Sequence, residues 1–142
     1  MRTVRDETGT RYLLVKRSSE SSLVRDPHTG EQRYLPNDEL AAVDGASALD
    51  VAASGVPEPV RRVVTAAHTE RALGLLIELA DRGPVGIRDL LAAYDLCESD
   101  LHGLLAEFRA AGLVHECDVA GERGYDATKT TREAVAALRP DP

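Results

Sequence analysis

Two cysteines and two histidines in the C-terminal half are the residues whose chemistry stands out first. Cys97, His102, His115 and Cys117 could all bind zinc through sulfur or imidazole nitrogen. The spacing of His115 and Cys117 puts both side chains on one face of a strand. Cys97 and His102 lie slightly off one face of an expected helix, and structural zinc sites usually have closer cysteine pairs. We therefore expect no metal site and no thiol redox switch.

The sequence lacks the motifs that catalysis and nucleotide binding need at fixed spacing. It contains no Gly-rich phosphate loop, no His-Glu-x-x-His and no nucleophile elbow of the Gly-x-Ser-x-Gly type. His28 and His68 each stand alone. We expect that the protein is not an enzyme and that it needs no cofactor.

The charge balance bears on the class of partner. The net charge is −7, whereas proteins that bind nucleic acid usually carry a basic surface. Of the 17 basic residues only Lys16 and Lys129 are lysine, and the many carboxylates are spread over expected solvent faces. This composition resembles that of halophilic archaeal proteins, with an acidic protein from a high-GC mesophile as the alternative. At ~1 M salt the screening length is only ~3 Å, so an acidic surface argues less strongly against DNA binding.

Four apolar stripes with one helical spacing organise residues 69–139. In each stripe the residues follow the pattern i, i+3, i+4, i+7, which is one face of a helix. The stripes are Leu73, Leu76, Ile77 and Ala80; Ile87, Leu90, Leu91 and Tyr94; Leu101, Leu104, Leu105 and Phe108; and Thr131, Ala134, Val135 and Leu138. Between the third and fourth stripes, residues 115–128 alternate around a Gly-containing turn, which predicts a β-hairpin.

The first 57 residues have a different character. In residues 1–36 the pattern Val-Arg-Asp, Thr-Gly, Arg-Tyr-Leu occurs twice, which predicts two successive hairpins in a small, net basic antiparallel sheet. Residues 37–57 contain no Lys or Arg and are rich in Ala, Gly and Ser, so we expect an acidic linker. Residues 58–68 form an apolar-faced helix that either dimerises or covers its own chain. The expected fold class is α+β.

The run from Asp95 to Val114 resembles the second and third helices of winged helix-turn-helix transcriptional regulators of the MarR/ArsR-like group. In that group a Ser-containing turn precedes a recognition helix that ends in Leu-x-x-x-Gly-Leu-Val. The hairpin with Gly121-Glu122-Arg123-Gly124-Tyr125 and the helix after it are also similar to that group. The resemblance covers roughly half of the chain. It implies a winged helix-turn-helix domain over residues 58–142.

The resemblance also implies where double-stranded DNA would bind. Residues 98–111 would be the recognition helix in the major groove, and residues 115–128 the wing. The implied DNA-binding residues are Arg88, Glu98, Ser99, Asp100, His102, Gly103, Glu107, Arg109 and Arg123. The sequence departs from the family pattern here, because recognition helices usually offer Arg, Lys, Asn or Gln to base edges and this helix offers mainly acids.

Two functions of different classes follow. The leading hypothesis is a sequence-specific transcriptional regulator that acts as a homodimer on DNA, with Arg2, Arg5, Arg11 or Arg33 of the basic zone adding contacts. The alternative is an adaptor within transcription or replication machinery that binds a protein through the same 98–111 helix, the N-terminal sheet or the 58–68 helix. In either case we expect a cytoplasmic protein without a membrane span, because the N-terminus is too polar for a secretory signal.

Overall fold

The computed structural model describes residues 1–141, which form six α-helices and two antiparallel sheets. The α+β class expected from the sequence is confirmed. The chain divides into two compact units, Met1–Pro57 and Glu58–Pro142. None of the helices in the described residues combines the length and the apolar composition that crossing a bilayer requires.

The first unit contains the four expected strands and a fifth that was not expected. All neighbours are antiparallel, in the order β4-β3-β2-β1-β5. The strands are β1 (Arg2–Arg5), β2 (Arg11–Arg17), β3 (Ser21–Arg25), β4 (Gln32–Pro36) and β5 (Ala41–Ala42). The repeated sequence explains two of the turns, because Asp6 Oδ1 accepts hydrogen bonds from the Thr8 and Thr10 amides, and Asp26 Oδ1 accepts one from the His28 amide.

Residue register divides this sheet into two faces. Val4, Tyr12 and Val24 are buried together on one side, which we call the Tyr12 face. Thr3 and Leu13 are opposite each other on the other side, the Leu13 face, because successive side chains of a strand alternate. Both Thr3 and Leu13 are buried.

Residues 37–57 were expected to be a linker, but they carry ordered elements of the first unit. They contain η1 (Asn37–Glu39), β5 and α1 (Ala48–Ala53). Ser47 caps α1 by accepting a hydrogen bond from the Leu49 amide, and Val51 of α1 is buried where the helix packs on β1 and β2. The Ala- and Ser-rich sequence did not indicate this helix, because α1 buries only one large side chain and therefore has no apolar stripe.

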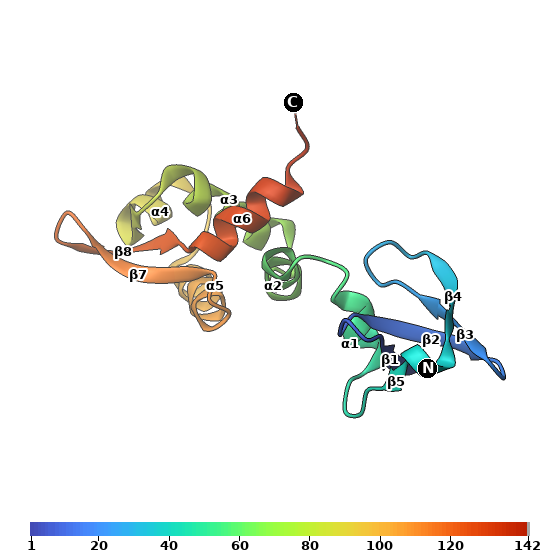
Figure 1. The fold of residues 1–142 in the computed structure, drawn as a ribbon. Coiled ribbons are helices and arrows are strands. Elements are labelled where there is room, and N and C mark those ends of the chain that lie inside the picture. Colours follow the sequence, from blue (N-terminus) through green and yellow to red (C-terminus); the bar gives the residue numbers. More distant parts are fainter. Residues whose placement is uncertain (142) are drawn as a thin grey trace. The chain divides into compact units, whose positions relative to one another are not determined.

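The second unit orders its elements as helix, helix, strand, helix, helix, hairpin, helix (Figure 1). They are α2 (Glu58–Ala66), α3 (Glu70–Arg82), β6 (Val85–Gly86), α4 (Ile87–Ala93), α5 (Glu98–Ala110), β7 (Val114–Val119), β8 (Glu122–Ala127) and α6 (Lys129–Leu138). The hairpin of β7 and β8 is present, and β6 joins it to give the order β6-β8-β7. The sequence did not suggest β6, because a two-residue strand has no periodicity.

One apolar core holds the second unit together. Leu76, Leu90, Leu101 and Phe108 are completely buried in it, so the second and third stripes face inward as expected. The stripe on α3 is shifted by one residue, because the buried residues there are Ala72, Leu75, Leu76 and Leu79. On α6, Thr131 is buried and its hydroxyl donates a 2.6 Å hydrogen bond to the Leu113 carbonyl, whereas Leu138 is exposed.

The two buried threonines predict opposite effects of one substitution. The Thr3 hydroxyl has no hydrogen-bond partner within the described residues, so Thr3→Val removes an unsatisfied group and keeps the β-branched shape. We expect the free energy of unfolding to rise by about 1 kcal/mol. Thr131→Val removes a satisfied hydroxyl and should lower it by about 1 kcal/mol. Chemical denaturation followed by circular dichroism measures both; a Thr3→Val variant that unfolds more easily would contradict this account.

Gly55 tests whether the end of α1 packs on the sheet. A Cβ at Gly55 would clash with the backbone carbonyl of Pro27, which lies in the loop between β3 and β4. Gly55→Ala should therefore destabilise the first unit by about 1–3 kcal/mol. Gly74→Ala is the matched control, because nothing lies within 4 Å of its Cβ position on α3, and it should stabilise by up to about 1 kcal/mol. A neutral Gly55→Ala variant would show that residues 54–56 act as the linker first expected.

Candidate nucleic-acid interface

Helix α5 is the element that the sequence marked as a recognition helix. It begins directly after Cys97, whose sulfur makes no capping bond to the helix and lies 3.4 Å from the Ser99 hydroxyl. Leu101, Leu105 and Phe108 on one side of α5 are completely buried. Their burial fixes the rotation of the helix, so the opposite side faces solvent.

The outward side of α5 is a stripe of small residues. Ser99, Gly103, Ala106 and Ala110 recur at helical spacing and are all exposed. A Cβ placed at Gly103 would meet nothing within 4 Å. The sequence prediction named Ser99 and Gly103 but not the two alanines, although the same spacing would have found them. Small side chains allow another molecule to approach the helix backbone closely.

One edge of this stripe faces the hairpin. There, α5 and β8 form a hollow of about 620 Å³, which we call the hairpin-side hollow. It is lined by His102, Ala106, Arg109, Ala110, Arg123 and Tyr125. In Figure 1 the tip of the hairpin extends beyond the helices. A two-residue turn forms this tip, with Ala120 and Gly121 both at positive φ.

Glu116 of β7 forms ion pairs with both arginines of this hollow. Its carboxylate oxygens lie 3.1 Å from Arg109 Nη1 and 3.0 Å from Arg123 Nε. Arg123 also donates a 2.9 Å hydrogen bond to the Tyr125 hydroxyl, which, with the charge of Glu116, raises the pKa of the guanidinium above its ordinary value. Both arginines are more than half exposed, so they can also reach a ligand. The sequence prediction missed Glu116 because it ignored cross-strand partners.

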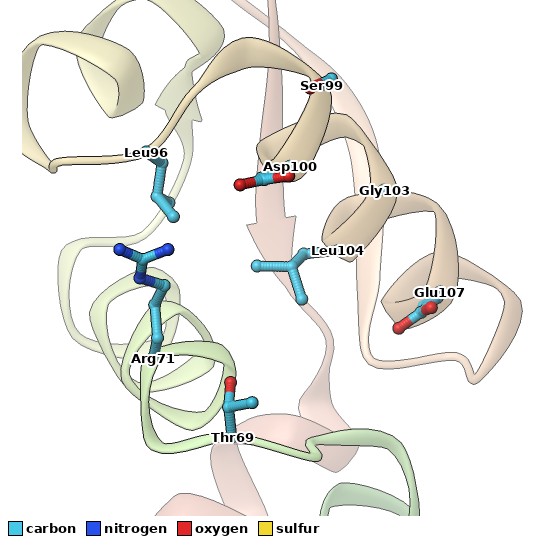
Figure 2. A pocket seen from close by; sticks show the side chains of 8 residues that line it. All are labelled: Thr69, Arg71, Leu96, Ser99, Asp100, Gly103, Leu104 and Glu107. Carbon is cyan, nitrogen blue, oxygen red and sulfur yellow. The ribbon is translucent and has the colours of Figure 1, made fainter.

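The other edge of the stripe faces α3 and is different in character. Here α5, α3 and Leu96 line a hollow of about 570 Å³, the α3-side hollow (Figure 2). Figure 2 shows Arg71 pointing into it from α3, and Asp100 and Leu104 pointing into it from α5 on the opposite wall. It is lined by Thr69, Arg71, Leu96, Ser99, Asp100, Gly103, Leu104 and Glu107. Asp100 and Glu107 carry two negative charges and Arg71 one positive charge, so this edge is net acidic.

The structure therefore divides the predicted DNA-binding residues. His102, Arg109 and Arg123 gather at the hairpin-side hollow, whereas Ser99, Asp100, Gly103 and Glu107 line the α3-side hollow. Two predicted residues line neither hollow. Arg88 is exposed on α4 and its backbone amide donates to Glu122 at 2.9 Å, and Glu98 lies 3.6 Å from the His102 imidazole.

The four residues considered as zinc ligands do not come together. Within residues 1–141, no group of three or more His, Cys, Asp or Glu side chains is arranged to hold a metal ion. Cys97 is exposed at the start of α5, whereas Cys117 is half-buried in β7. His115 lies 3.9 Å from Asp126 on the neighbouring strand, a carboxylate that Arg132 also contacts at 2.7 Å.

Comparison with known proteins identifies the family. The chain belongs to a family of unknown function, DUF7346, whose profile matches residues 1–139. The match spans both units, so their combination is a property of the family and not of this chain alone. No curated protein and no solved structure matches the chain. Evidence for the function of this chain therefore comes from the geometry of the α5 surface.

The two cysteines should differ in reactivity. Burial, and then the nearby charges of Asp126, Asp118 and Glu116, raise the pKa of the Cys117 thiol, so less of the reactive thiolate forms at neutral pH. We expect iodoacetamide to label exposed Cys97 first and Cys117 only slowly, at a rate that keeps rising above pH 9. Mass spectrometry of the Cys97→Ser and Cys117→Ser variants separates the two rates. Equal labelling at neutral pH would contradict the placement of Cys117.

Proposed function

We propose that residues 58–142 are a winged helix-turn-helix domain that binds double-stranded DNA and regulates transcription. The order α3, β6, α4, α5, β7, β8 supports this, as does the three-stranded sheet that places the hairpin beside α5. In such a domain the helix after the turn enters the major groove and the hairpin contacts the flanking backbone. Here α5 is the recognition helix and β7–β8 is the wing.

The observation that carries the proposal is the open outward side of α5 beside two arginines. Ser99, Gly103, Ala106 and Ala110 let the helix backbone approach the floor of a groove. In this proposal His102 and Ser99 read base edges, and Arg109 and Arg123 contact phosphates. Because α5 offers few readers of base edges, specificity needs two half-sites, and we propose a homodimer.

Glu116 sets the strength of the proposed DNA contact. It already pairs with both Arg109 and Arg123, so a phosphate must compete with its carboxylate. Glu98, Asp100 and Glu107 on α5 add repulsion. This charge balance suits binding in concentrated salt, where repulsion beyond a few ångströms is screened and short contacts dominate.

A protein adaptor is the second candidate, and the α3-side hollow favours it. Leu96 and Leu104 line this hollow with apolar side chains from opposite sides, while Asp100 and Glu107 provide charges that attract a basic partner. Val64 on α2 is 60% exposed and adds an apolar surface elsewhere on the unit. In this case the winged helix would bind a basic protein segment through the acidic edge of α5.

Removing the carboxylate between the two arginines distinguishes the candidates. We expect Glu116→Gln to tighten binding to a DNA duplex by roughly twofold to fivefold. Each freed arginine can then pair with a phosphate, and that contact contributes about the free energy of one exposed ion pair. The matched control is Glu133→Gln, which removes the same charge from α6, where Glu133 pairs with Lys129. Fluorescence anisotropy on duplexes selected from a random pool measures both affinities.

The complementary variant removes the two arginines. Arg109→Gln/Arg123→Gln should weaken binding and reduce the slope of log affinity against log salt by roughly 1.8, which corresponds to two lost phosphate contacts. Arg132→Gln/Arg139→Gln is its control, since both of those arginines are also in ion pairs, with Asp126 and Asp81. If no duplex is selected from the pool, or if both double variants behave alike, DNA binding through α5 is wrong and the adaptor takes its place.

A further inference from the structure

Three arginines gather at one end of the Leu13 face of the first unit. Arg5 on β1 is directly opposite Arg11 on β2, and Arg25 on β3 is opposite Leu13, two residues along β2 from Arg11. Since every second residue of a strand shares a face, Arg5, Arg11 and Arg25 all lie on the Leu13 face. We call this set the arginine row. Its neighbour on β5 is Ala41, which carries no charge.

No carboxylate neutralises the arginine row in the described part of the chain. None of its three side chains takes part in an ion pair or a side-chain hydrogen bond there, although Arg5 and Arg11 are exposed. The aspartates of the two adjoining turns are engaged elsewhere. Asp6 accepts hydrogen bonds from Thr8 and Thr10 and reaches Tyr12 on the other face, and Asp26 accepts from His28.

This arrangement is unfavourable for the free protein. Like charges directly opposite each other on neighbouring strands destabilise a sheet, and Arg5 and Arg11 are such a pair. The chain has 24 acidic residues, yet ion pairs with them engage Arg109 and Arg123 and leave the arginine row without a carboxylate partner in the described residues. An anionic ligand would remove the repulsion.

We propose that the arginine row binds the phosphodiester backbone of a nucleic acid. The row crosses three strands, which is roughly 10 Å at the usual strand spacing. That width is too large for one phosphate group and suits several successive phosphates of one strand. Guanidinium groups that contact phosphate oxygens provide affinity without sequence preference. This adds a second nucleic-acid contact to the one proposed for α5 and can be tested separately from it.

The test compares two double variants of the full chain that lose the same charge. Arg5→Gln/Arg11→Gln removes two members of the arginine row. The sequence grouped Arg2 with Arg5 and Arg11, but strand register separates them: Arg2 and Arg17 are opposite Leu14 and Ser22 on the Tyr12 face of the same sheet. Arg2→Gln/Arg17→Gln is therefore the matched control. Affinity for a mixed-sequence duplex of about 24 base pairs is measured over a series of salt concentrations.

We expect the salt slope to fall by roughly 1.8 for Arg5→Gln/Arg11→Gln and to stay unchanged for the control. The melting temperature of the first variant should equal or exceed that of the original chain, because the Arg5–Arg11 repulsion is gone. In NMR spectra of the original chain, the side-chain Nε–H signals of Arg5, Arg11 and Arg25 should shift when the duplex is added.

Three results would overturn the proposal. Equal loss in both double variants would show that only net charge matters. An unchanged slope in Arg5→Gln/Arg11→Gln would show that the row makes no phosphate contact. Inorganic phosphate that shifts the same Nε–H signals at the same concentration as the duplex would assign the row to a free anion. Because Arg109→Gln/Arg123→Gln reports on α5 alone, failure of that contact leaves the result for the arginine row intact.

Discussion

The burial of Leu101, Leu105 and Phe108 is the constraint on which the proposed function depends. These three side chains anchor α5 in the core of the second unit and thereby fix which residues it exposes. The exposed stripe is small, and its two edges differ in charge because one faces the hairpin and the other faces α3. A helix held this rigidly can present one surface to a groove without reorganising, which lowers the entropic cost of binding.

Charge is distributed unevenly between the two units, which suits the different contacts proposed for them. In the second unit, carboxylates balance the arginines beside α5, so that surface depends on short, specific contacts. In the first unit the arginine row has no such partners, so that surface suits attraction to phosphates of any sequence. A chain that combines both could first bind DNA loosely and then recognise a site, as two linked contacts raise overall affinity.

The elements with a strong repeating pattern could be predicted from the sequence. The stripes of α4 and α5 face the core as expected, and the repeated Asp and Thr-Gly turns mark the two hairpins of the first unit. Short elements could not be predicted, because β6 and β5 have two residues each and α1 buries only Val51. The candidate site was predicted as one surface, yet Asp100 lines the α3-side hollow and Arg123 of β8 lines the hairpin-side hollow, on opposite sides of α5. The separation follows from the rotation of α5 about its axis, which the sequence pattern did not define closely enough. Glu116 was missed because its contacts with Arg109 and Arg123 depend on the register of β7 and β8.

The most direct measurement is an amide NMR map of the full chain as a selected DNA duplex is added. The account predicts the largest changes along the outward side of α5, at Ser99, Gly103, Ala106 and Ala110, and at Arg123 in the hairpin. Buried residues of α5 such as Leu105 should change little. Changes confined to the α3-side hollow around Arg71 and Leu96, or no changes in α5 at any DNA concentration, would contradict the account.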